Sequence, residues 1–320
     1  MGSAASWRTF FQSKLVRRAT RVVQVVIFFG VLALITKHLA DIGWNEIWSA
    51  LPRTPWFYIL IVCAYVTLPV AEVFVYEKIW GIPMWKRLPV LFRKRVLNEG
   101  VMGYSGEAYL CLWAHRHTDL PGNSILSTVK DNNILSAVVS TSAALILFFG
   151  FMLSGKLHDV TGGDLSNKWM LVGMLAVSGL WIPVVYRFRK RLIALPRPTV
   201  GKVLVIHFLR LLAAESLQVM YWMVVLPFVP LSAWLTFTAA QMLLTRVPLL
   251  PNKDLMLLGL GITLAAVVNV PATAVTALFL AGGATIQFLH LIVFFVTTPI
   301  GMGKTENDSE EVPEPTRIPS

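Results

Sequence analysis

Long apolar runs constrain this chain more than any other feature of its sequence. Residues 56–80, 203–226 and 274–300 are each about as long as an apolar helix that crosses a bilayer. Backbone polar groups inside a bilayer must be satisfied within the segment, so runs of this length favour helices over short alternating strands. The sequence therefore predicts an all-α, polytopic helical membrane protein.

The composition agrees with this class. Hydrophobic residues make up 56% of the chain and charged residues 14%, which leaves no stretch for a soluble catalytic domain. A membrane domain is predicted over 22–302, after a basic amphipathic lead at 1–21 and before an acidic, disordered tail at 303–320. About seven to eight spans are expected, and the others are 22–36, 134–153, 169–186, 255–270 and, if it crosses fully, 232–247.

Basic clusters set the expected orientation. The formal net charge is +11, and in a membrane protein such a surplus indicates topology and contact with anionic lipid rather than nucleic-acid binding. The bases of the lead, of 86–95 and of 187–202 fall on one side if the first span runs from inside to outside. We expect a cytoplasmic N-terminus and a bacterial inner membrane; the side of the C-terminus stays open.

Residues 91–117 are too polar for lipid and too apolar for water. They contain three consecutive bases at 93–95, include Gly103 and Gly106, and end on two histidines and an arginine at 115–117. Polar or irregular backbone at membrane depth is tolerated where other helices shield it. We expect a broken, re-entrant hairpin. The alternative is a surface amphipathic helix whose glycines serve helix packing.

A second interrupted stretch, 233–254, follows Pro227 and Pro230. It either crosses the membrane or forms a second re-entrant hairpin, and the flanking charges leave both open. Matching interruptions in two halves of a chain indicate an inverted repeat around a transporter binding site, although residue identity between these halves is poor. Arg246 and Asp254 are candidate site residues there, with a plain loop as the alternative.

Ionisable residues within spans cost roughly 3 kcal/mol or more at the bilayer centre, so they need partners or water. Glu72 in the second span either handles a headgroup or proton or pairs with a neighbouring base. Arg210 and Glu215 lie on one broad side of 203–226 together with His207. Arg210 is suited to phosphate binding or to snorkelling towards the interface, and Glu215 is expected to serve function.

Missing motifs exclude several chemistries. The sequence has no Walker A loop, so we expect no intrinsic ATPase, and it has no HExxH or C-x-x-C pattern. Cys63 and Cys111 lie in apolar segments, so no disulfide is expected. Neither a metal nor a cofactor is expected, and no spacing suggests nucleophilic catalysis.

The first hairpin resembles a motif of the lysylphosphatidylglycerol synthase transmembrane family, the flippase-like region of the multiple peptide resistance factor. The family motif is similar to Pro-Gly-x-x-Gly-Glu in a hairpin that an asparagine leads. Gly103, Gly106 and Glu107 match it after Asn98, while Met102 stands in place of the proline.

This resemblance covers most of the chain. Glu215 stands where many members carry a glutamate before the second hairpin. There, Pro251 is kept, but Asn252 and Lys253 replace the family's glycines before Asp254. The resemblance implies re-entrant hairpins from opposite sides and lipid translocation. It does not imply aminoacyl transfer, because the synthase domain of some members has no counterpart here.

The expected function is translocation of a phospholipid or other anionic headgroup, without an ATP-driven step of its own. Bases would attract phosphate, and carboxylates would handle an amine, a proton or the bases. A membrane enzyme acting on lipid or polyprenyl phosphate, a non-catalytic scaffold or regulator of envelope-lipid synthesis, and a homo-oligomer are left open. The candidate substrate-binding residues are Glu72, Arg93, Arg95, Asn98, Gly103, Gly106, Glu107, Arg210, Glu215, Arg246 and Asp254.

Overall fold

The computed structural model describes most of the chain. The described residues are 48–100, 103–153, 183, 186–188, 190–245 and 271–302. Outside them lie the predicted lead and tail, the spans 22–36 and 255–270, most of the span 169–186, and Met102, Arg246 and Asp254. Within the described ranges every regular element is a helix, which confirms the predicted all-α class.

Three described helices are long and apolar enough to cross a membrane. They are α4 (Pro55–Trp80), α10 (Arg197–Val225) and the stretch Thr273–Thr297 of α13 (Ala272–Met302). The helices expected at 56–80, 203–226 and 274–300 are confirmed, although α10 begins already at Arg197. By length and composition, these helices mark an integral membrane protein.

Local sequence explains where α4 begins and ends. Pro55 opens the helix at a position where a missing N–H is not needed for a helical hydrogen bond. Gly81 ends it with a φ of 68°, a left-handed conformation that favours glycine, and its N–H donates to the Glu77 carbonyl at 3.0 Å. The Glu77 side chain then accepts from the Met84 N–H at 2.9 Å, which holds the turn that leads into the next helices.

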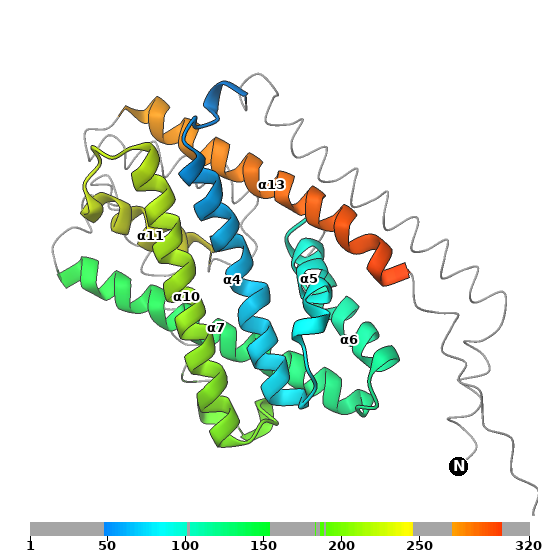
Figure 1. The fold of residues 1–320 in the computed structure, drawn as a ribbon. Coiled ribbons are helices and arrows are strands. Elements are labelled where there is room, and N and C mark those ends of the chain that lie inside the picture. Colours follow the sequence, from blue (N-terminus) through cyan, green and yellow to red (C-terminus); the bar gives the residue numbers. More distant parts are fainter. Residues whose placement is uncertain are drawn as a thin grey trace, which may run out of the picture.

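α4 and α10 lie side by side in opposite directions (Figure 1). Near the start of α4, the Phe57 ring meets the Tyr221 ring from the end of α10, with centroids 5.7 Å apart. Near the end of α4, Val75 shares a hydrophobic cluster with Val203 from the start of α10. The end of α4 and the beginning of α10 therefore lie at the same end of the molecule.

An aromatic cluster joins α10 to α11 (Leu231–Thr245) and α13. The Trp222 ring lies 5.4 Å, between centroids, from both the Trp234 and the Phe279 rings. Only the first part of the interrupted stretch 233–254 is described, and it is helical to Thr245. Whether this stretch crosses or re-enters therefore stays a prediction.

The stretch 91–117 forms a helical hairpin. A short helix, η1 (Trp85–Arg87), leads into α5 (Leu88–Gly100), and α6 (Ser105–His117) runs back beside it (Figure 1). The left-handed residue before α6 is Tyr104, with a φ of 69°, and not one of the glycines. The expected break between two helices is thus confirmed.

Gly106 allows α5 and α6 to approach closely. A Cβ at this position would lie 2.1 Å from the Lys94 carbonyl oxygen and 2.7 Å from Asn98 Oδ1. Gly103 differs, because a Cβ there would meet nothing within 4 Å. Of these two glycines, Gly106 is therefore the one at a close backbone contact.

The span expected at 134–153 is the second part of a longer helix, α7 (Gly122–Leu153), whose first part, 122–133, is polar. This part is helical because polar side chains such as Asp131 and Asn132 find partners inside the protein. The fully buried Asp131 accepts backbone N–H groups of Ala194 and Leu195 at 2.7 and 3.0 Å. Polar groups satisfied in this way do not oppose a buried helix.

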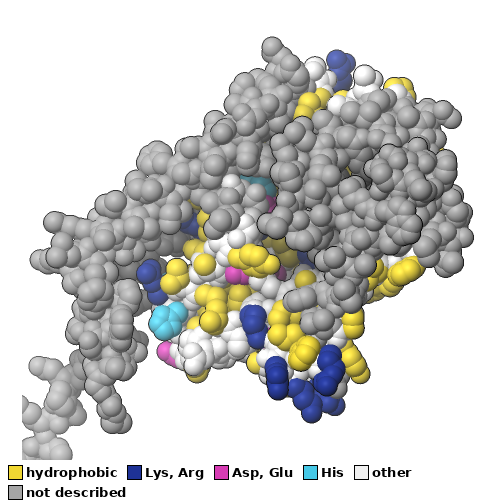
Figure 2. Space-filling view, turned by 180° about the vertical axis from the view of Figure 1, so that it is seen from behind, with side chains coloured by type: hydrophobic (Ala, Val, Ile, Leu, Met, Phe, Trp, Pro, Cys, Tyr) yellow, Lys and Arg dark blue, Asp and Glu magenta, His cyan; other side chains and the backbone are white. Residues whose placement is uncertain are grey.

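Basic side chains gather at the end of the molecule where α10 begins (Figure 2). Lys190, Arg191, Arg197 and Lys202 are exposed there. Exposed Lys86, which follows α4, belongs to the same end because α4 finishes where α10 starts. Two of the basic clusters in the sequence therefore share one end, as the orientation inferred from charge requires.

Replacing Gly106 by alanine should separate α5 from α6, because the new methyl would collide with the backbone of Lys94. Overpacking of this kind costs about 1–3 kcal/mol in the free energy of unfolding. Gly103→Ala is the matched control, with an expected change within about 0.5 kcal/mol. Detergent-driven unfolding of the purified protein measures both, and equal effects at the two glycines would contradict this packing.

Candidate functional site

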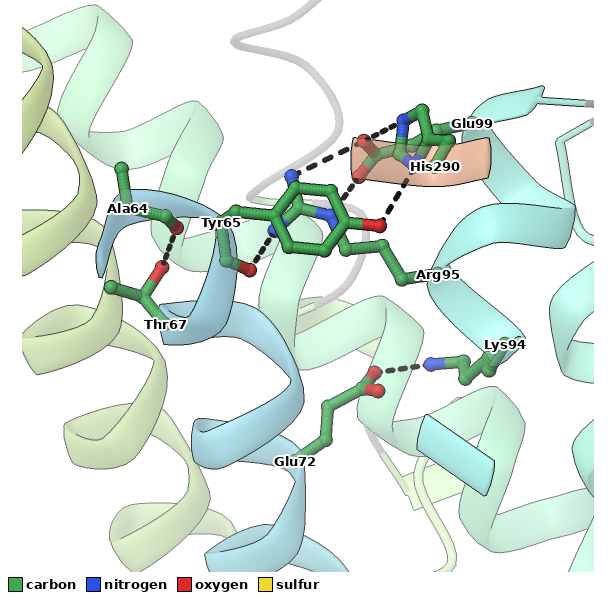
Figure 3. Close-up of polar contacts among 8 residues, drawn as sticks. All are labelled: Ala64, Tyr65, Thr67, Glu72, Lys94, Arg95, Glu99 and His290. Atoms are coloured by element: carbon green, nitrogen blue, oxygen red, sulfur yellow. Dashed lines mark hydrogen bonds and ion pairs between the residues drawn. The ribbon is translucent and has the colours of Figure 1, made fainter. Parts of the chain in front are cut away.

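Lys94 occupies the contact between α4, α5 and α6. Its residue exposure is 3%, and its ammonium pairs with the Glu72 carboxylate of α4 (Figure 3). The Nζ atom also lies 3.4 Å from Oε1 of Glu107 on α6. A single cation thus connects three helices through two carboxylates that the sequence marked as candidates.

The charges around Lys94 hold it in the protonated form. Burial alone disfavours an ammonium, but the carboxylates of Glu72 and Glu107 place opposite charge beside it. One ammonium faces two carboxylates, so Glu107 is incompletely neutralised. Its Oε2 is buried and has no hydrogen-bond partner among the described residues. The Glu107 side of Lys94 is therefore where another polar group is best placed to enter.

A second polar network lies beside the first and joins α4, α5 and α13 (Figure 3). Arg95 Nε lies 2.9 Å from the Glu99 carboxylate, and the Arg95 guanidinium also donates to the Tyr65 carbonyl. His290 on α13 has Nε2 3.2 Å from Glu99 Oε2 and Nδ1 2.8 Å from the Tyr65 hydroxyl. The guanidinium carbon of Arg95 also lies over the Tyr65 ring, 4.1 Å from its centroid.

Arg93 is directed to a third side of α5. Its Nη1 donates to the Thr297 carbonyl of α13 at 3.3 Å. The guanidinium carbon lies 5.5 Å and 5.6 Å from the ring centroids of Tyr109 and Phe294. Such contacts stabilise a partly desolvated arginine through the negative faces of the rings. The three consecutive bases of α5 therefore contact different neighbours.

Asn98 and Gly106, two residues of the family-like motif, bind each other. The Gly106 N–H donates to Asn98 Oδ1 at 2.6 Å, so this amide is not open to an anion in this conformation. Next to them, the Ser105 hydroxyl donates to the Leu97 carbonyl at 2.7 Å. The motif thus fixes the hairpin turn and sets the position of Glu107 on the first turn of α6.

A chain of polar contacts continues from Lys94 towards α10. The Tyr76 ring lies 5.9 Å from Lys94 Nζ, and its hydroxyl accepts from Asn132 of α7 at 3.3 Å. Asn132 Oδ1 is 2.9 Å from Nε2 of the buried His207. Lys94 and Arg210 both lie close enough to His207 to interact with it electrostatically.

The polar side of α10 faces other helices, as its sequence indicates. Beyond His207, Gln218 donates to Gln241 of α11 at 2.5 Å. Arg210 and Glu215 are partly buried between these two contacts. Arg210 is the nearer of the two to His207, and so to the polar contacts that lead from His207 back to Lys94. Glu215 lies more than one helical turn further along α10.

Three residues at the centre of the two networks were not among the sequence candidates: Lys94, Glu99 and His290. A signal existed for two of them. Lys94 falls at helical spacing between the buried Leu91 and Leu97, so it lies on the apolar face of α5. His290 is an ionisable group inside an apolar span, the same kind of costly residue that drew attention to Glu72.

Comparison with protein-family models, with curated proteins and with solved structures gives no match to this chain. The resemblance in the Gly103–Glu107 motif therefore stays a prediction.

Replacing Lys94 by methionine should strongly destabilise the protein, because Glu72 and Glu107 would be left buried without their cation. Breaking a buried ion pair costs about 3–5 kcal/mol. The triple variant Lys94→Met, Glu72→Gln, Glu107→Gln should recover most of this loss, since no uncompensated charge remains.

Unfolding free energies of the wild type, Lys94→Met, the double variant Glu72→Gln, Glu107→Gln and the triple variant give the coupling between these sites. A loss below about 1 kcal/mol for Lys94→Met, or no recovery in the triple variant, would contradict the buried pairing.

Proposed function

We propose that this chain translocates an anionic phospholipid headgroup across a membrane, with the α5–α6 hairpin re-entering the membrane beside α4. One observation carries the proposal. On the hairpin, the buried Lys94 and the partly buried Arg95 pair with carboxylates of α4, α5 and α6, and the partly buried Arg93 contacts a carbonyl of α13. Burying such charge is costly, and sites of this kind in membrane proteins mark substrate paths.

The depth of the hairpin supports re-entry. Along α5, Lys94 meets Glu72 and Arg95 meets Tyr65, so the hairpin rises along α4 as far as its middle. At 1.5 Å per residue, Tyr65 lies roughly 20 Å from the Trp80 end of α4. The hairpin then returns, because Ala114 near the end of α6 clusters with Trp80 and Leu91. Entry from the basic end corresponds to the cytoplasmic side by the positive-inside rule.

Exchange of ion-pair partners gives a mechanism for headgroup binding. A phosphate oxygen would take the place of a carboxylate oxygen at Lys94 or Arg95, and an arginine can bind phosphate through two N–H groups. Glu107 is the partner best suited to release, because its contact with Lys94 is long at 3.4 Å and its other oxygen has no described partner. The acyl chains would remain in lipid while the headgroup moves along the hairpin.

The family-like motif supports the same interpretation. Its last residue is Glu107, the carboxylate that contacts Lys94, and its glycine Gly106 sets the spacing between the two helices. The residues that carry the resemblance are thus those that build the buried contact.

Headgroup movement in vesicles tests this function. In proteoliposomes of phosphatidylcholine with a trace of fluorescent phosphatidylglycerol, Glu107→Gln should slow reporter movement by roughly 10-fold or more, because it removes the exchangeable partner of Lys94. Asp119→Asn, which changes an exposed carboxylate, is the matched control and should move lipid at the wild-type rate. Equal rates for wild type, Glu107→Gln and protein-free vesicles would refute translocation and favour the scaffold alternative.

A further inference from the structure

Resting on the translocation proposed above, we propose that Glu99 and His290 form a proton-binding site, so that one proton moves with each anionic headgroup. The observation behind it is the network that joins Tyr65, Arg95, Glu99 and His290 across three helices (Figure 3). The sequence candidates included neither Glu99 nor His290.

Both ring nitrogens of His290 are engaged, which fixes how the site takes up a proton. In the neutral ring, Nε2–H donates to Glu99 Oε2, and Nδ1 accepts from the Tyr65 hydroxyl. A second proton on Nδ1 makes an imidazolium, and the Tyr65 hydroxyl turns to accept from it. The new positive charge lies 3.2 Å from the Glu99 carboxylate, so the added proton has both a place and a counter-charge.

The charges of the described residues explain why anion and proton would bind together. Three bases of the hairpin, Arg93, Lys94 and Arg95, equal in number the three carboxylates of Glu72, Glu99 and Glu107, and two of these bases pair with them. A phosphate that enters this region leaves one negative charge in excess. Uptake of one proton cancels it, and by linkage the proton strengthens anion binding as much as the anion strengthens proton binding.

The groups around His290 favour this position for the proton. From α4 it faces the Tyr65 hydroxyl, and from α5 it faces Glu99 with Arg95 behind it. Arg93 contacts α13 at Phe294 and Thr297, further along the helix. The side chain of Glu99 is 37% exposed while that of His290 is 1% exposed, so the carboxylate is the more accessible member of the pair.

His207 provides a matched comparison. It is equally buried on a membrane helix, but its Nε2 faces the neutral Asn132 amide, and the cations Arg210 and Lys94 lie near it. A positive charge on His207 would face cations, whereas one on His290 faces a carboxylate. Replacing His207 should therefore leave proton coupling intact.

The steady-state distribution of lipid across a vesicle tests the site. The proteoliposomes are made of phosphatidylcholine with a trace of fluorescent phosphatidylglycerol, and valinomycin clamps their membrane potential. An external quencher reports how the fluorescent lipid is distributed between the two leaflets. For one proton per headgroup, a gradient of one pH unit shifts that distribution by up to about tenfold in the wild type. With His290→Gln or Glu99→Gln the distribution should return to that without a gradient, while His207→Gln keeps the shift.

The outcomes separate the two proposals. Lipid exchange in the wild type with no response to the pH gradient would overturn proton coupling and leave translocation standing. A shift that persists in both Glu99→Gln and His290→Gln, or that is lost in His207→Gln, would overturn the assignment to this site. Absence of any lipid exchange in the wild type would overturn both proposals.

Discussion

The cost of a charge in a medium of low polarity is the constraint on which the described structure depends. Lys94 is almost completely buried, and α5 can carry it only because Glu72 and Glu107 come from two neighbouring helices. The pairing fixes the rotation of α5 about its axis, and that rotation directs Arg93 and Arg95 to their own partners. Packing at Gly106 then allows α6 to approach closely enough for Glu107 to reach the ammonium.

Much of the helical frame could be predicted from the lengths of the apolar runs and from the prolines and glycines that interrupt them. The helices at 56–80, 203–226 and 274–300 appear where the sequence indicates, and the glycines of 91–117 lie near the break between α5 and α6. The beginning of α7 could not be predicted in this way. Its first turns are polar, yet Asp131 is fully buried because it binds backbone N–H groups more than 60 residues away. Such partners are invisible to local composition.

The candidate site shows the same limit. Periodicity can place Glu72 and the three bases 93–95 on their helices, but it does not show which base faces which acid. Arg93 and Arg95 were preferred for phosphate binding, whereas Lys94 forms the most buried pair. Glu99 and Glu107 lie on different helices of the hairpin, and they contact His290 and Lys94 respectively. These pairings depend on the rotation of packed helices, which the contacts themselves set.

Direct observation of lipid beside Lys94 would test the central claim that the buried bases of α5 exchange protein carboxylates for a headgroup. The measurement is an experimental structure in a lipid nanodisc that contains phosphatidylglycerol. The account predicts phosphate density at hydrogen-bond distance, about 3 Å, from Lys94 or Arg95, with the Glu107 carboxylate displaced. Intact pairs at Lys94 and Arg95, with ordered phosphatidylglycerol headgroups bound only on the outer surface of the helices, would contradict it.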